Sequence, residues 1–213
     1  MLLPSSRIFL FSKTSYPDVN HIPILHIDYF QPLIDFSTYD YIIATSKEVF
    51  AALDKIGVWK DIPILAISKP TEEFAKKIGA KILDVSDGYG KSVVELIKDK
   101  FMHLNALYPH AEVVAFDIED SLNELGVKVD SFSVYKTSCS KAERIDLPSD
   151  AICIFTSPSA VKCFEALYEF RPSYKIVCIG DTTRSALPKG VESLTSENTS
   201  VQSTIECAKK LIQ

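Results

Sequence analysis

The sequence of 213 residues lacks the features that mark membrane and secreted proteins. No apolar run approaches the roughly 18 residues that a membrane-spanning helix needs. Residues 1–7 show no charged stretch that leads into a long apolar one, so we expect neither a membrane protein nor a secretion signal. The five cysteines are odd in number and include no Cys-x-x-Cys pair. We therefore expect a reducing compartment and a cytoplasmic protein.

The sequence also lacks the signatures of metal, cofactor and nucleic-acid sites. Its four histidines are scattered without the spacing of metal ligands, and neither a Gly-x-Gly-x-x-Gly turn nor a Gly-x-Ser-x-Gly elbow occurs. Residues 90–92 read Gly-Lys-Ser, but Val85 stands where a phosphate-binding loop needs its first glycine. The net charge of −5 gives nucleic-acid binding no electrostatic support. We expect no metal, no cofactor and no nucleic-acid partner.

What the sequence does contain is a regular alternation of apolar runs and amphipathic stretches. Apolar content of 46% and charged content of 24% are ordinary for a globular protein, and the length suggests two domains of about 100 residues each. Strands that alternate with helices predict parallel sheets covered by helices. We expect strands at 7–12, 22–30, 39–44, 62–67, 80–85, 112–116, 127–135, 151–155, 175–179 and 191–194, and helices at 46–56, 71–78, 92–107, 119–125, 159–170, 182–187 and 201–212.

The chain repeats one pattern. Residues 42–46, an apolar strand that ends in Thr-Ser, return as residues 152–157, again followed by an amphipathic helix. The next strand in each copy is followed by a threonine, Thr71 in the first copy and Thr183 in the second. The repeat predicts two similar α/β units, each with hydroxyl-bearing turns between strand and helix.

The domain boundaries follow from the strand count. The first two strands are too few for a domain, and the C-terminal block has too few strands for a comfortable sheet of its own. Joining them gives a five-stranded sheet. We therefore expect one discontinuous domain made of residues 1–28 and 136–213, and an inserted domain of residues 29–135. The chain would cross between them twice, through a two-strand linker that forms a hinge with a cleft beneath it.

The hydroxyl-bearing turns are candidate anion sites. A strand end followed by a helix start offers free backbone N–H groups and the positive end of the helix dipole, and ligands bind at the carboxyl ends of parallel strands. The alternative for each hydroxyl is that it serves only as an ordinary helix N-cap. The alternative for Tyr135, at the end of its strand, is that it is an ordinary strand aromatic. The turns carry Thr45-Ser46, Thr71, Thr156-Ser157 and Thr182-Thr183.

Short motifs in this order resemble the uroporphyrinogen-III synthase family over nearly the whole chain. They are Ile-Phe-Thr-Ser-Pro-Ser-Ala-Val at 154–161, Ile-Gly-Asp-Thr-Thr at 179–183, Val-Tyr-Lys-Thr at 134–137, the Thr-Ser pair at 45–46, and Thr71. The resemblance implies two α/β domains, one of them discontinuous, and no cofactor. It implies a lyase of tetrapyrrole and heme biosynthesis that closes the linear hydroxymethylbilane to uroporphyrinogen III, with loss of water and inversion of the last pyrrole ring.

The resemblance also assigns roles to residues. Tyr135 matches the tyrosine of the family and would donate a proton to the departing hydroxyl, and Thr71 and Thr183 match threonines near the substrate. The substrate carries eight carboxylates, which backbone amides and hydroxyls can hold. The expected substrate-binding residues are Thr45, Ser46, Ser157, Ser159, Thr182 and Ser92.

Some positions depart from the family pattern. Only residues 13–21 stand where the family usually has a full helix between its first two strands, so one sheet face would be open or covered by a partner. The turn at 116–120 is acidic, Ser68-Lys69-Pro70 replaces the usual glycine before Thr71, and Glu48 stands where a basic residue is common. We expect a monomer, with dimerisation through the shortened N-terminal region as the alternative.

Two other functions compete with the synthase. One is a non-catalytic two-domain sensor of a small polyanionic metabolite that uses the same cleft. The other is a transferase or isomerase that acts on a phosphorylated metabolite, which the missing phosphate loop, metal ligands and general base disfavour.

Overall fold

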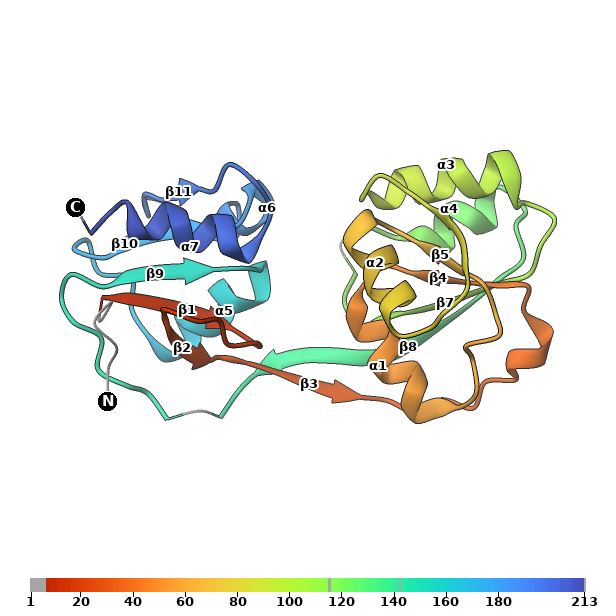
Figure 1. Cartoon of the computed structure of the whole chain (residues 1–213), viewed down its shortest axis with the longest axis horizontal. Coiled ribbons are helices and arrows are strands. Elements are labelled where there is room, and N and C mark those ends of the chain that lie inside the picture. The colour runs from red at the N-terminus through yellow and green to blue at the C-terminus, as the bar shows by residue number, and fades with distance from the viewer. Residues whose placement is uncertain (1–6, 115, 142, 213) are drawn as a thin grey trace. The chain divides into compact units, whose positions relative to one another are not determined.

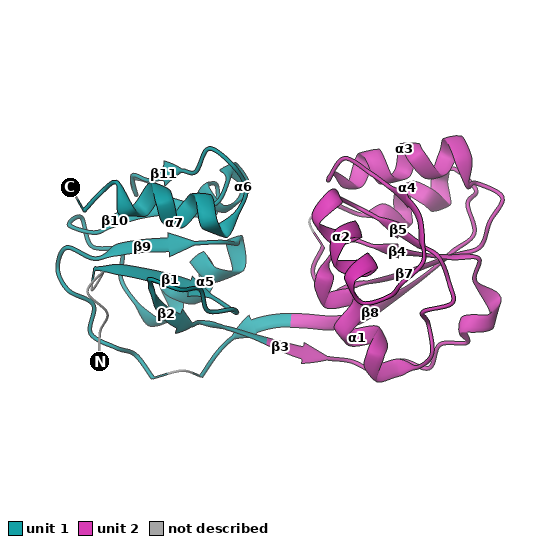
Figure 2. Cartoon of the chain, in the orientation of Figure 1, with its two compact units in different colours: residues 1–26, 137–213 teal, residues 27–136 magenta. Residues whose placement is uncertain are grey.

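The computed structural model describes residues 7–114, 116–141 and 143–212. Contacts between Cα atoms divide the chain into two compact units, unit 1 with residues 1–26 and 137–213 and unit 2 with residues 27–136 (Figure 2). Each unit is built on one sheet, and the sheet of unit 1 combines N-terminal and C-terminal strands. The predicted α/β class with one discontinuous unit is confirmed. Among the described residues, no helix is both long and apolar enough to cross a membrane.

Unit 1 holds a five-stranded sheet in the order β11-β10-β9-β1-β2, and its strand pairs are parallel. Helices α5 and α7 cover opposite faces of this sheet (Figure 1). The elements are β1 (Ile8–Ser12), β2 (Asn20–Pro23), β9 (Ile152–Phe155), α5 (Pro158–Leu167), β10 (Lys175–Cys178), α6 (Asp181–Arg184), β11 (Leu194–Thr195) and α7 (Val201–Lys209).

The sheet face that we expected to be open in unit 1 is covered. Strand β1 is apolar at four successive positions, as a strand buried on both faces must be. Phe9 and Phe11 pack in the core that α5 covers, and Ile8 and Leu10 pack with α7 and with Val19 from the short connection to β2. Both Ile8 and Leu10 are 0% exposed. The missing crossover helix therefore leaves no apolar surface on β1 that a partner would need to cover.

Unit 2 holds a six-stranded sheet in the order β3-β8-β7-β4-β5-β6. Side chains alternate between its faces: Ile42 and Ala44 pack on the side of α1 and α2, and Tyr41 and Ile43 pack on the side of α3 and α4. The elements are β3 (Leu25–Tyr29), the 3₁₀ turn Phe36–Thr38, β4 (Tyr41–Ala44), α1 (Lys47–Ile56), β5 (Ile64–Ala66), α2 (Lys69–Lys77), β6 (Ile82–Val85), α3 (Gly90–Lys100), β7 (Ala106–Ala111), α4 (Ile118–Glu124) and β8 (Val129–Cys139).

Three predicted elements are wrong. The single strand expected at 22–30 is broken at Ile24 into β2 and β3, which lie in different sheets. The long helix expected at 92–107 ends at Lys100, and the strand that follows is Ala106–Ala111 rather than 112–116. Phe101 and Leu104 continue the apolar face of α3 in side-chain packing after the helix has ended, which is why the helical period ran on in the sequence.

Strands β3 and β8 both contain a unit boundary, so the chain passes from one unit to the other within them. The Phe30 N–H donates to the Val134 carbonyl at 2.9 Å, and the Ser140 N–H donates to the Ile24 carbonyl at 2.9 Å. The partners run in opposite order, so this pair is antiparallel, unlike its parallel neighbours. The end of the chain's first crossing is thereby paired with the start of its second.

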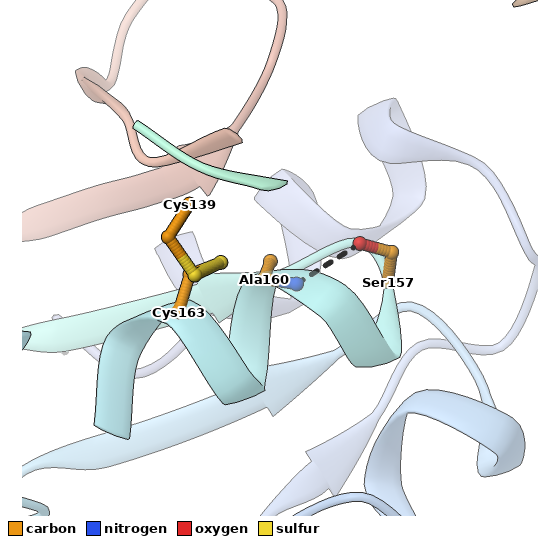
Figure 3. Close-up of a disulfide and its surroundings, with 4 residues drawn as sticks. All are labelled: Cys139, Ser157, Ala160 and Cys163. Carbon is orange, nitrogen blue, oxygen red and sulfur yellow. Dashed lines mark hydrogen bonds between the residues drawn. A yellow bond between two sulfur atoms is a disulfide. The ribbon is translucent and has the colours of Figure 1, made fainter. Parts of the chain in front are cut away.

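A disulfide joins Cys139, at the end of β8, to Cys163 in α5, with a Cα–Cα distance of 5.2 Å (Figure 3). This bond runs against the expectation of a reducing compartment, because disulfides persist mainly in oxidising surroundings. The sequence could not reveal the pair, since a strand end and a helix 24 residues apart show no local spacing signal. Cys153 and Cys178 are buried and free, as small core residues of β9 and β10.

Candidate active site

The first turn of unit 2 follows β4. Ser46 is the N-cap of α1, and its Oγ accepts a hydrogen bond from the Glu48 N–H at 3.1 Å. Thr45 and Ser46 are both half-buried. Because β4 pairs in parallel with β5 and β7, the carboxyl ends of these strands meet at one edge of the sheet. The predicted residues Thr45 and Ser46 therefore lie at the edge where ligands bind in sheets of this kind.

The second turn of unit 2 follows β5, and here the hydroxyl of Thr71 is engaged within the turn. Ser68 is the N-cap of α2, and its Oγ lies 3.1 Å from the Thr71 Oγ1. The Thr71 N–H also donates to the Ser68 carbonyl at 3.0 Å, and Thr71 is only 5% exposed. The helix begins at Lys69 rather than at Thr71, so Ser68 is the cap that the sequence analysis missed. Its signal was a serine directly before Lys-Pro.

The third turn of unit 2 follows β6 and is tied back to the second. Gly88 has a φ of +105°, a backbone conformation that favours glycine, and its N–H donates to the Ile67 carbonyl at 2.7 Å. Ser92 is the third residue of α3 and lies in its first turn. The Tyr89 N-cap makes no side-chain capping bond. Ser92 thus lies at the start of a helix at the same sheet edge as Ser46.

Tyr135 lies on β8 and is 7% exposed. Burial raises the pKa of its hydroxyl above the usual value, a hydrogen bond with the Ser46 side chain lowers it, and the charge of Glu48 adds to the rise. Tyr135 is therefore neutral and protonated at physiological pH. Two residues predicted from distant parts of the sequence, Tyr135 and Ser46, are brought together.

Two tyrosines that the sequence analysis missed belong to the same group. The Tyr29 hydroxyl on β3 donates to Glu48 Oε2 at 2.8 Å, and burial together with Glu48 raises the pKa of Tyr29 to about 12. Tyr108 on β7 is 3% exposed, and burial raises its pKa to about 12 against the opposing effect of a hydrogen bond with Thr45. Tyr29 could have been predicted from the pairing of its strand β3 with β8, the strand that carries Tyr135. Tyr108 was hidden because its strand was misplaced.

Unit 1 has turns that correspond to those of unit 2. Ser157 is the N-cap of α5, and its Oγ accepts from the Ala160 N–H at 3.2 Å (Figure 3). Ser159, the second residue of α5, is half-buried. After the neighbouring strand β10, Thr183 is 3% exposed and Thr182 is exposed. These four predicted residues lie at the carboxyl ends of two adjacent strands.

The repeat is closer at the first turn of each unit than at the second. Ser46 and Ser157 are both N-caps whose hydroxyls accept backbone N–H groups. At the second turn, Ser68 of unit 2 faces Thr71, whereas unit 1 has Gly180 at the N-cap of a four-residue helix, with no side-chain capping bond. The Thr183 N–H donates to the Gly180 carbonyl at 3.1 Å.

A cavity of about 490 Å³ in unit 2 lies away from these residues. It is lined at the amino ends of β7 and β8, by Ala106 and Val129 among others, and contains no predicted site residue. Among the described residues, no three His, Cys, Asp or Glu side chains gather in a way that could hold a metal ion. Within unit 2, the carboxyl edge offers hydroxyls, backbone amides and the Glu48 carboxylate, and the first turns of its helices also carry Lys47, Lys69 and Lys91.

Comparisons with known proteins show the family and the fold of the chain. Residues 18–206 match the family described as Uroporphyrinogen-III synthase HemD. The uroporphyrinogen-III synthetase of Helicobacter pylori 26695 shares the fold with a TM-score of 0.83 at 22% identity, over 96% of this chain and 99% of that one. A mutant uroporphyrinogen III synthase of the extremely thermophilic bacterium Thermus thermophilus gives a TM-score of 0.61 at 17% identity, over 97% and 98%. No curated protein matches. Because the family match spans most of the sequence, the chain belongs to the uroporphyrinogen-III synthase family.

Proposed function

We propose that the protein is an active uroporphyrinogen-III synthase, which closes hydroxymethylbilane to uroporphyrinogen III with loss of water and inversion of the last ring. The observation that carries the proposal is the buried, protonated hydroxyl of Tyr135 beside the N-cap Ser46, at the carboxyl edge of the unit 2 sheet. Family membership supports the reaction class, and Tyr135 is the proton donor that we assign to it.

The substrate is a polyanion, and the proposed binding groups are neutral donors. Hydroxyls at helix starts and the N–H groups of those first turns hold carboxylates without requiring a basic protein. In unit 2 these are the turns of Thr45, Ser46 and Ser92. In unit 1 they are the turns of Ser157, Ser159, Thr182 and Thr183. A net charge of −5 is compatible with such local binding.

The first chemical step is loss of the terminal hydroxyl. The Tyr135 hydroxyl donates its proton as the carbon–oxygen bond breaks, water leaves, and an electrophilic azafulvenium cation remains beside the tyrosinate. A raised pKa keeps the phenol in the protonated form that this step needs. After closure, the far ring that attacked loses one proton, which returns to the tyrosinate and restores the neutral phenol.

The second task is geometric. The far ring must attack through its substituted carbon, form a spiro intermediate, and reopen and reclose in the inverted sense. Unassisted closure uses the unsubstituted carbon and gives the uninverted isomer. Holding the bent chain in one pose is an orientation effect, for which many carboxylate contacts are well suited. The Thr71 hydroxyl is hydrogen-bonded to the Ser68 hydroxyl, so in this proposal it helps to orient the substrate from a fixed position in the second turn.

A product-isomer assay tests the function. Purified protein supplied with freshly made hydroxymethylbilane is expected to yield the inverted isomer faster than unassisted closure yields the uninverted one. Only the uninverted product, at the unassisted rate, would reject the synthase. If the protein then still bound a linear tetrapyrrole tightly, the non-catalytic sensor would take its place.

A further inference from the structure

The Glu48 side chain at this edge does not fit a site built only to hold anions. Glu48 is the second residue of α1 and is half-buried, its N–H donates to the Oγ of the Ser46 cap, and its negative charge helps to raise the pKa of Tyr135. In the family resemblance a basic residue is common at this position. A carboxylate here opposes the binding of a substrate with eight carboxylates, because like charges repel.

The Glu48 carboxylate is oriented by a hydrogen bond. The Tyr29 hydroxyl donates to its Oε2 at 2.8 Å, and the Lys55 Nζ lies 5.2 Å from the centre of the Tyr29 ring. The Glu48 backbone N–H is fixed as well, because it donates to Ser46 Oγ. The start of α1 also favours a negative charge at this position. Elements β3, α1 and β8 thus converge on one oriented carboxylate and one protonated phenol.

We propose that the Glu48 carboxylate is a further catalytic group, which accepts the N–H of the terminal pyrrole ring and stabilises the positive charge that develops there as the hydroxyl leaves. Tyr29 is the positioning residue of this pair. The inference rests on the proposed function and adds a second group to it. An interaction that is unfavourable toward the anionic ground state and favourable toward a cationic transition state raises turnover.

The carbon–oxygen bond breaks, the oxygen leaves as water with the Tyr135 proton, and the pyrrole nitrogen donates its electron pair toward the exocyclic carbon. The resulting azafulvenium carries one positive charge, shared with the N–H that faces Glu48. That proton either stays on nitrogen or moves to the carboxylate, which gives the neutral azafulvene. Attack by the far ring and the final loss of a ring proton restore Tyr135 and Glu48.

The test separates transition-state stabilisation from simple repulsion. Glu48→Gln keeps the size of the side chain and removes its charge, and we expect kcat to fall at least tenfold while KM stays the same or decreases. Tyr29→Phe leaves the carboxylate in place without its donor, and we expect a loss of a few-fold in kcat. Glu73→Gln is the matched control, since it removes an exposed negative charge from the neighbouring helix α2 and should change neither constant.

Each outcome decides the inference. An unchanged kcat with a lower KM in Glu48→Gln would mean that the carboxylate only repels substrate, and would overturn it. A loss of kcat that Glu48→Asp partly rescues, with an unaltered circular dichroism spectrum, supports it. If the wild type itself makes no inverted isomer, the proposed function fails instead. The pair has an independent readout, because the pKa of Tyr29 should fall from about 12 in Glu48→Gln, as followed by tyrosinate absorbance.

Discussion

At the scale of single residues, Tyr135 carries the sharpest expectation. Tyr135→Phe removes only the hydroxyl, and the ring is 7% exposed in the core of unit 2, so the fold should survive. Loss of a general acid typically costs about 10²-fold or more in rate. We expect kcat in the isomer assay to fall by about that factor, with a melting temperature within a few degrees of wild type. Wild-type turnover in this variant would reduce Tyr135 to a packing residue.

Buried tyrosines also predict how stability depends on pH. The pKa of Tyr108 is raised by burial to about 12, above its usual value of about 10 in an unfolded chain. A phenol whose pKa is higher in the folded than in the unfolded chain contributes stability that is complete below pH 10. This stability is lost as pH rises toward 12, because the unfolded chain ionises first. Denaturant titrations should therefore show the free energy of unfolding falling by about 1 to 2 kcal/mol over this window from Tyr108 alone. Tyr108→Phe should flatten the decline, and an identical slope in the variant would contradict the assignment.

At the scale of elements, the two N-caps allow a matched comparison. Ser46→Ala and Ser157→Ala each remove a hydroxyl that accepts a backbone N–H at the start of a helix, so each should cost about 1 kcal/mol in urea denaturation. Ser46 also contacts Tyr135, whereas Ser157 caps a helix of the other unit. We expect Ser46→Ala to lower kcat in addition, and Ser157→Ala to act chiefly on KM. If the two variants changed kcat and KM equally, the contact between Ser46 and Tyr135 would have no special role in catalysis.

Some elements of the fold could be predicted from the sequence and others could not. Apolar strands such as 39–44 and 151–155 were predictable because burial on both faces demands continuous apolar residues. The end of α3 was not, since Phe101 and Leu104 remain in the core after the helix stops. The hydroxyl turns were predictable from the repeat. The Tyr29–Glu48 pair was not, because it joins a strand and a helix that sequence spacing does not relate.

At the scale of the whole molecule, the Cys139–Cys163 disulfide predicts a measurable stabilisation. Closing a loop of about 25 residues is worth about 3.5 kcal/mol in the chain-entropy account. Cys139→Ser and the reduced wild type should both lose roughly this amount in denaturant titrations. Cys207→Ser, which replaces a cysteine outside the disulfide, serves as the control. Peptide mapping without reductant should recover the linked pair, and free thiols at both positions under oxidising conditions would contradict the pairing.

The way the sheet of unit 1 is assembled has a consequence for synthesis on the ribosome. Strands β1 and β2 emerge first, but their sheet partner β9 follows only after the whole of unit 2. Unit 2 is continuous in sequence and can fold as soon as it has emerged, whereas the Ile-Phe-Leu-Phe run of β1 must wait without β9. During that interval the nascent chain exposes an aggregation-prone segment, so slow translation between residues 30 and 150 would lengthen its need for a chaperone.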